Sequence, residues 1–386
     1  MASRGSRTRT KTRTTYTKRK LNRLLSLIIK ILAGVLGACV LVFLYLIIFT
    51  DVFHPLTRLY RTEIPVTAEV SASSNEIYCL DANRLECIGF DGKVEWETEF
   101  SGSNYDINVS DTLVCIYNSN SASVLDADKN VLFSIPGAEY NILNAKCGKN
   151  HIALLCSLES DRTLYYVRVF SVSGEEIYRA DYESADVLSY DMFGETDNLW
   201  VLTLDTSGVS PVSRITTFAP MQNAMTGTLE INDQLVSDVY YSDSNMYLSG
   251  TYNMLTYDTF GQKQGSTLVY GLKCIDSAFS GSDYTMVYMQ RTDDNISQAN
   301  TLRVISRSGE TERDSFLQLP GEAEAVYTSS NHVYCFMKNK VYIYKLTGEF
   351  YKETEFDFNI TGSQKIASDK VLLVSEDKVV YYLQLG

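Results

Sequence analysis

Histidine, tryptophan and proline are scarce in this chain. Its 386 residues include three His, two Trp and six Pro, which leaves few side chains for general-base catalysis or for ligation of a transition metal. The patterns C-x-x-C, G-x-S-x-G, H-E-x-x-H and the P-loop are all missing, so the usual signs of a redox or zinc site, a hydrolase or a nucleotide-binding enzyme are missing too. We therefore predict that the protein is not an enzyme, with no cofactor and no catalytic, cofactor-binding or metal-binding residue.

Acidic residues are absent from the first 50 positions, which hold ten Lys and Arg. The rest of the chain holds 24 Lys and Arg against 47 Asp and Glu, a balance of −23. Binding a nucleic acid requires basic side chains that neutralise its phosphates. We therefore expect no nucleic-acid partner for this acidic body.

A run of 19 uncharged, mostly apolar residues extends from Ile31 to Phe49. Together with Leu24 to Ile29 it exceeds the ~20 residues that a membrane-spanning helix needs. The Lys and Arg before it place the N-terminal side in the cytoplasm, and no small-residue cleavage site follows it. For a single-pass plasma-membrane protein, we predict a basic disordered cytoplasmic tail at 1–23, a transmembrane signal-anchor helix at 24–49, a juxtamembrane linker at 50–59 and an extracytoplasmic domain at 60–386.

The tail is too polar and charged to fold alone. Its basic residues are expected to attract anionic membrane lipid at ~1 kcal/mol for each residue near the surface. The predicted membrane-surface residues are Arg13, Lys18, Arg19, Lys20, Arg23 and Lys30. Leu36 to Cys39 resemble a lipobox, but the apolar run continues from Val40 to Phe49. We interpret Cys39 as a helix residue, with its lipidation as the alternative.

Seven cysteines follow the apolar run, an odd number: Cys79, Cys87, Cys115, Cys147, Cys156, Cys274 and Cys335. Several lie inside apolar stretches, such as Leu113-Val114-Cys115-Ile116. A buried free Cys behaves as a small hydrophobic residue. Unpaired thiols in a translocated domain favour an anaerobic or weakly oxidising environment.

A small or polar residue, then Asn or Asp, then an apolar strand recurs eight times. The Asn or Asp of each copy is Asn75, Asp111, Asn150, Asn198, Asn245, Asp283, Asn331 and Asp369, at intervals of 36, 39, 48, 47, 38, 48 and 38 residues. A second turn follows in most copies, as at Asp91-Gly92 and Thr347-Gly348, where Gly supplies the positive φ of a hairpin. Four short strands with a mean period of 42 residues are typical of a propeller blade. We predict an all-β, eight-bladed β-propeller, or seven blades if the irregular fourth unit around Pro220-Met221-Gln222 is misread.

The last unit predicts how the ring closes. Gly386 ends the chain 17 residues after Asp369, where the second turn of the eighth unit should stand. The outermost strand of this unit is therefore missing at the C-terminus, and residues 60–67 before the first unit fit the vacancy. We predict that one blade combines both ends of the domain.

The stretch from Leu80 to Trp96 (LDANRLECIGFDGKVEW) resembles the quinoprotein-like, or PQQ-like, propeller repeat, in which a strand, a D-x-x-G turn and an aromatic-bearing strand recur. The layout of residues 18–386 is similar to that of uncharacterised membrane-anchored propeller proteins of Firmicutes, a family with no assigned reaction. The chain departs from true quinoproteins because it has only two Trp, Trp96 and Trp200, and no adjacent cysteine pair.

Other polar candidates are predicted to be turn or loop residues. His151 and His332 occupy the same place in their repeats, and a ligand pair on one rim is the alternative interpretation. Asp126, Asp128 and Asn130 resemble the start of a calcium loop but lack its Gly and distal Glu, so we predict a hairpin turn. The remaining candidates are His54 at the membrane exit and the acidic loop 292–295.

Tyrosine is abundant, with 27 copies and adjacent pairs at 165–166, 240–241 and 381–382. Neighbours in a strand point to opposite faces, so one of each pair should pack between blades while the other faces a groove, a rim or solvent. Exposed Tyr is enriched in recognition surfaces.

We predict a membrane-anchored, non-catalytic scaffold that binds a protein partner or a cell-envelope polymer. The alternatives are a glycan-acting or cofactor-dependent enzyme with its site in the central channel, and a sensor that signals through the helix.

Overall fold

The computed structural model describes residues 30–32, 34–42, 56–136, 140–158, 160–183, 185–242, 245–290 and 300–386. The chain divides into two compact units, Met1–Thr57 and Arg58–Gly386. In the first unit, residues 30–32 and 34–42 are helical. Within the described residues, no helix is both long enough and apolar enough to cross a membrane. The transmembrane helix at 24–49 therefore remains a prediction.

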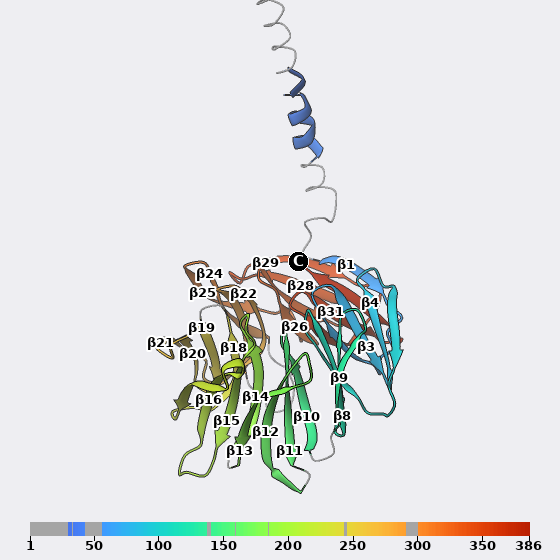
Figure 1. Cartoon of the computed structure of the whole chain (residues 1–386). Coiled ribbons are helices and arrows are strands. Elements are labelled where there is room, and N and C mark those ends of the chain that lie inside the picture. Colours follow the sequence, from blue (N-terminus) through green and yellow to red (C-terminus); the bar gives the residue numbers. More distant parts are fainter. Residues whose placement is uncertain are drawn as a thin grey trace, which may run out of the picture. The chain divides into compact units, whose positions relative to one another are not determined.

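The second unit consists of eight four-stranded antiparallel sheets (Figure 1). Blade 1 contains β2 (Glu69–Ala72), β3 (Glu76–Asp81), β4 (Arg84–Gly89) and β5 (Val94–Glu99), and blade 2 contains β6 (Asp106–Val109), β7 (Leu113–Asn118), β8 (Ser121–Asp126) and β9 (Val131–Pro136). Blade 3 contains β10 (Tyr140–Cys147), β11 (His151–Leu158), β12 (Asp161–Ser171) and β13 (Glu176–Tyr182). Blade 4 contains β14 (Asp186–Phe193), β15 (Asn198–Asp205), β16 (Val212–Ala219) and β17 (Ala224–Ile231).

Blades 5 to 7 contain β18 (Val236–Tyr241), β19 (Asn245–Gly250), β20 (Asn253–Asp258) and β21 (Lys263–Leu268); β22 (Leu272–Ser280), β23 (Asp283–Gln290), β24 (Thr301–Ser308) and β25 (Thr311–Gln318); and β26 (Ala325–Thr328), β27 (His332–Met337), β28 (Lys340–Lys345) and β29 (Phe350–Glu355). Blade 8 contains β30 (Ile360–Ala367), β31 (Lys370–Ser375), β32 (Val380–Leu385) and β1 (Leu56–Arg61). The eight-bladed propeller predicted from the repeat is confirmed.

The first strand of each blade lies innermost. Contacts run from β2 to β6, from β6 to β10, from β10 to β14 and from β14 to β18, and again from β22 to β26, to β30 and back to β2. Between blades 5 and 6, the ring of Tyr240 on β18 stacks on that of Phe279 on β22 with centroids 5.2 Å apart, and this contact completes the ring. Each recurring Asn or Asp lies in or next to the turn between the first and second strands of its blade, where the repeat placed it.

Blade 8 joins both ends of the propeller, as predicted. Strand β1 pairs with β32 at the outer edge of this sheet. The N–H of Thr62 donates to the carbonyl of Val380 over 2.9 Å, and the rings of Tyr60 and Tyr382 stack with centroids 5.0 Å apart. The closing strand is Leu56–Arg61, earlier than the predicted 60–67, because residues after Thr62 already cross toward β2.

Apolar residues of neighbouring blades form the core between them, and Tyr contributes its largest side chains. Fully buried Tyr side chains include Tyr78, Tyr247, Tyr288, Tyr334 and Tyr382. The cysteines of the described residues are free, and most of those in the propeller are buried, so their predicted role as small hydrophobic residues is confirmed. Burial raises the pKa of both Cys79 and Cys87 to about 12.

Candidate binding groove between blades 4 and 5

The two repeat-related histidines lie too far apart to act together. His151 begins β11 in blade 3, and His332 begins β27 in blade 7. Three blades lie between them in either direction around the ring of eight, so they lie on opposite sides of the ring. The alternative interpretation as a shared ligand pair is therefore wrong, because equivalent positions of different blades are separated by the rotation of the ring.

His151 instead takes part in a contact between blades, which we call the Asp197 latch. Its Nδ1 lies 2.9 Å from Oδ2 of Asp197, and the N–H groups of Lys149 and Asn150 each donate to the same carboxylate over 2.6 Å. Asp197 lies in the turn between β14 and β15 and is only 3% exposed. The latch therefore fixes a turn of blade 3 to a turn of blade 4, and the prediction of a turn-flanking residue is confirmed.

The remaining sequence candidates do not form a site in the described residues. Asp126 accepts the N–H of Asn130 over 2.8 Å in the turn between β8 and β9, which confirms the predicted hairpin. His54, residues 292–295 and the predicted membrane-surface residues before Lys30 lie outside the described residues. Lys30 is helical and exposed.

A groove opens between blades 4 and 5, on the face that carries the turns after β14, β18 and β20. Two adjoining hollows of about 510 Å³ and 440 Å³ form it. They share the lining residues Phe193, Asn198, Tyr241 and Thr259. We name it the aromatic groove after six of its lining residues: Phe193, Trp200, Tyr240, Tyr241, Phe260 and Phe279.

Aromatic contacts across the blades build the floor of the aromatic groove. The rings of Phe193 and Tyr241 stack with centroids 4.1 Å apart, and Trp200 lies 6.2 Å from Tyr241. Tyr240 stacks on Phe279 of blade 6 with centroids 5.2 Å apart. Burial raises the pKa of the Tyr241 phenol, which therefore remains neutral. Such stacked pairs add about 0.5–1.5 kcal/mol each beyond area burial, so the floor is rigid.

The connection between the two outer strands of blade 4, beside the aromatic groove, is irregular. Where blades 1, 3, 5, 6 and 7 have a Gly-bearing hairpin, the 3₁₀ turn η2 (Pro220–Gln222) joins β16 to β17, and Asn223 takes the left-handed conformation with φ 49°. Gly227 on β17 adds no side chain to the wall. On the blade 5 side, Asp258 accepts the N–H groups of Phe260 and Gln262 over 2.9 and 2.8 Å. This turn presents Phe260, which is 87% exposed, at the rim.

The electrostatics of the aromatic groove favour neutral or cationic ligands. Its lining, within the described part of the chain, holds the carboxylates of Asp191 and Asp258 but no Lys or Arg. Asp191 marks the inner end, where its Oδ2 lies 3.8 Å from Nζ of Lys146 in blade 3. Burial raises the pKa of Asp191, and the charge of Lys146 opposes this rise. An anionic cofactor would find no basic partner in the lining itself.

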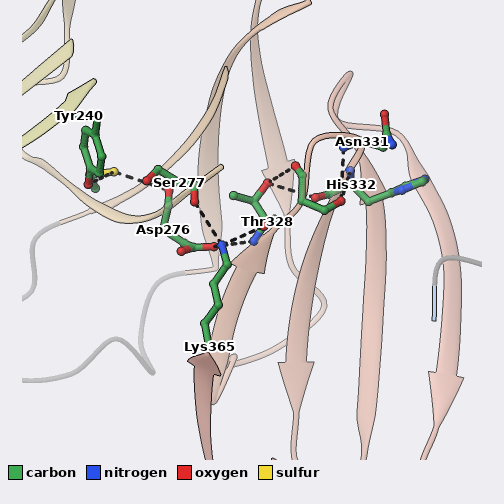
Figure 2. A network of polar contacts seen from close by, with 9 residues as sticks. Tyr240, Asp276, Ser277, Thr328, Asn331, His332 and Lys365 are labelled. Atoms are coloured by element: carbon green, nitrogen blue, oxygen red, sulfur yellow. Dashed lines mark hydrogen bonds and ion pairs between the residues drawn. The ribbon is translucent and has the colours of Figure 1, made fainter. Parts of the chain in front are cut away.

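A second polar cluster joins three blades at their innermost strands (Figure 2). Nζ of Lys365 on β30 lies 2.6 Å from Oδ2 of Asp276 on β22 and donates to the carbonyls of Ser277 and Thr328 over 3.1 and 3.0 Å. The N–H of Thr328 on β26 donates to the same carboxylate over 2.7 Å. We call this the Lys365 network. Because the ammonium group already has three partners, we interpret the network as a structural contact that connects blades 6, 7 and 8.

Among the residues that the structure describes, one cluster brings together groups that can ligate a metal. Ligand atoms of Glu76, Cys87 and Glu95 in blade 1 all lie within 4.8 Å of one another. The hydroxyl of Tyr78 donates to Glu76 over 2.5 Å, and burial raises the pKa of Cys87 to about 12. A thiol with that pKa is protonated at neutral pH, and a metal would have to displace the proton.

Sequence reasoning missed the aromatic groove as a site. The available signs were the irregular turn of the fourth unit and the Tyr240–Tyr241 pair. The two tyrosines alternate as expected, since Tyr241 stacks on Phe193 of blade 4 and Tyr240 on Phe279 of blade 6. Both nevertheless contact the groove. Phe193, Trp200 and Phe279 come from separate strands and gave no sign that they would meet.

The ring of eight blades places the protein among the β-propellers. Solved structures with this fold include BamB from Moraxella catarrhalis, 12% identical, which matches 86% of this chain and 100% of its own with a TM-score of 0.53. The C-terminal WD40 domain of Sif2 is 12% identical and covers 83% and 98% with a TM-score of 0.55. Dihydro-heme d1 dehydrogenase NirN is 10% identical and covers 83% and 71% with a TM-score of 0.52. At these identities the likeness concerns the fold alone.

The chain belongs to DUF5711, a family of unknown function, whose model matches residues 67–381. No curated protein matches the chain. This family match does not test the resemblance to quinoprotein repeats or to proteins of Firmicutes, and both remain predictions.

Proposed function

We propose that this protein is a membrane-anchored, extracytoplasmic and non-catalytic scaffold that binds a protein partner in the aromatic groove. The carrying observation is the continuous groove between blades 4 and 5, where several aromatic side chains from three blades converge. Concave, mostly apolar sites with a few convergent polar groups are the usual binding sites of proteins. Aromatic anchors contribute most to affinity in protein interfaces.

The expected occupant is an extended, basic segment of a partner protein that carries an apolar or aromatic side chain. The apolar side chain would pack on Phe193 and Tyr241, whose rings already stack. Basic side chains would face Asp191 and Asp258, in a body with a balance of −23 after residue 50. The absence of Lys and Arg from the described lining argues against an anionic cofactor of the quinone-tricarboxylate type.

Site-specific photocrosslinking in the native membrane tests this proposal. A photoreactive phenylalanine analogue replaces Phe260 at the rim of the groove, and in the control it replaces Phe316 on β25, which is also exposed (63%). We expect one protein adduct from position 260 that is missing at position 316. Equal adducts at both positions, or no protein adduct at 260, would refute the groove as the partner site.

The same proposal assigns the N-terminal segment to anchoring. The basic tail would lie on anionic lipid in the cytoplasm, helped by the threonines between its basic residues, which remain uncharged until phosphorylated. Phosphorylation adds about −1.5 to −2 charges per site and should release the tail peptide from vesicles that contain phosphatidylserine. Equal vesicle binding of plain and phosphothreonine peptides would contradict this part of the proposal.

A further inference from the structure

The face opposite the aromatic groove carries a second aromatic feature at the same blade junction. Tyr252 lies in the turn between β19 and β20, and Tyr270 lies in the loop between β21 and β22. Their rings stack with centroids 5.4 Å apart and an interplanar angle of 14°. Tyr252 is 46% exposed and Tyr270 is 69% exposed. Two large rings held parallel at the surface contribute little to the core, so their order needs another explanation.

A hollow of about 570 Å³ lies beside this tyrosine pair. Its polar side chains include Ser210, Asn232, Asp233 and Thr251. All are hydroxyl, amide or carboxylate groups that hydrogen-bond to neutral polar ligands. The described lining contains no Lys or Arg, so phosphate or carboxylate ligands lack a charge partner there.

The buried side chain of Gln234 fixes the loop that carries Tyr252. Its Oε1 accepts the N–H groups of Tyr252 and Asn253 over 3.0 and 2.7 Å, and its Nε2 donates to the carbonyl of Asn253 over 3.2 Å. Gly250 permits this packing, because a Cβ at that position would lie 2.5 Å from the Gln234 side chain. The backbone groups of this loop are thus already used, which leaves the side chains to recognise a ligand.

We propose that the tyrosine pair and its hollow form a binding site for an uncharged saccharide chain. The C–H groups on one side of a sugar ring pack on a flat aromatic face, while its hydroxyls accept and donate hydrogen bonds around the edge. Tyr252 backs Tyr270 and holds its orientation, so little freedom is lost on binding. A peptide strand would need free main-chain groups for pairing. Those of residues 252 and 253 are already occupied by the Gln234 side chain and, at the Tyr252 carbonyl, by the N–H of Val269.

Titration calorimetry of the full-length chain in detergent tests this site with two neutral probes, cellotetraose and chitotetraose. Polygalacturonate serves as the anionic comparison. We expect at least one neutral probe to bind and polygalacturonate not to bind. Loss of one stacking ring should weaken binding by about tenfold in Tyr252→Ala and in Tyr270→Ala. Tyr270→Trp should retain binding because it keeps the aromatic face.

The control is Tyr351→Ala on β29 of blade 7, because Tyr351 is also a partly exposed tyrosine, at 44%, but lies outside the hollow. This variant should bind the neutral probe as the unmodified chain does. Failure of both neutral probes to bind, equal binding of polygalacturonate, or full binding by Tyr270→Ala would each overturn the proposal. Circular dichroism of each variant confirms that the blades are intact. The result is independent of crosslinking at Phe260, which concerns the opposite face.

Discussion

Replacing Lys365 by Met would remove the central member of the Lys365 network while keeping most of the volume of its side chain. The ammonium group contacts the Asp276 carboxylate at 2.6 Å and two carbonyl oxygens, those of Ser277 and Thr328. These groups come from three different blades (Figure 2). The substitution would leave the carboxylate with the N–H of Thr328 but without its counter-ion.

The loss of stability follows from the burial of this pair. The side chains of Lys365 and Asp276 are 15% and 14% exposed. Removing one partner of a buried ion pair costs about 3–5 kcal/mol, and we take about 3 kcal/mol because some water reaches the pair. For a unit of about 330 residues, an unfolding entropy of about 2.1 cal/mol/K per residue converts this cost into a fall in Tm of about 4 °C.

The effect of this substitution should depend on pH. Burial raises the pKa of Asp276, and the charge of Lys365 opposes the rise. An acid with a raised pKa in the folded state binds protons more tightly there, so stability falls as pH rises from the unfolded to the folded pKa. Without the charge of Lys365, the folded-state pKa of Asp276 rises further, so the pH range over which stability falls extends to higher pH. The Tm deficit of the variant should therefore be larger at about pH 7.5 than at about pH 4.5, where a protonated Asp276 needs no counter-ion.

The matched control is Lys340→Met on β28. Nζ of Lys340 lies 3.8 Å and 3.9 Å from the carboxylates of Glu353 and Glu355, and its side chain is 32% exposed. Such a pair contributes under about 1 kcal/mol. Circular dichroism melts of the full-length chain measure both variants. If Lys365→Met melts like Lys340→Met, or if its deficit does not change with pH, the reasoning fails.

Three further outcomes are expected. Asp197→Ala should lower Tm by about 3 °C through the loss of about 2 kcal/mol, whereas Asp258→Ala, which affects one hairpin, should lower it less; equal melts would contradict the role of the Asp197 latch. Deleting residues 56–61 should expose the edge of β32 and produce dimers or aggregates in size-exclusion chromatography, and a stable monomer would show that β1 is dispensable. Iodoacetamide at about pH 8 should leave Cys79 and Cys87 unmodified in the native protein, because burial raises both pKa values to about 12, and mass spectrometry should detect their labelling after denaturation.

The repeat was predictable because it depends on short-range chemistry. Each Asn75-like residue favours a tight turn next to its own strand, and each apolar run alternates within a few residues. Even the closure by both ends followed from counting, because Gly386 stops one strand too early for a complete blade. The bounds of the closing strand, Leu56–Arg61, were predicted wrongly as 60–67, because Tyr60, Ile64 and Val66 alternate with polar residues there in the manner of a strand.

The candidate sites were not predictable in the same way. Lys365 and Asp276 are 89 residues apart, and nothing near either residue in sequence indicates the other. Phe193 and Tyr241 meet only because blades 4 and 5 are neighbours. Tyr252 and Tyr270 meet only because a turn within blade 5 lies beside the loop that joins blade 5 to blade 6.

The sequence by itself determined the number of blades, the turns and the manner of ring closure, because these depend on backbone conformation and on a pattern that every copy repeats. Only the tertiary structure decided where the ring is hollowed, which charges are paired and which aromatic rings remain exposed. The physical reason is that such properties belong to the contacts between blades, where each copy differs from the next and side chains distant in sequence share one space.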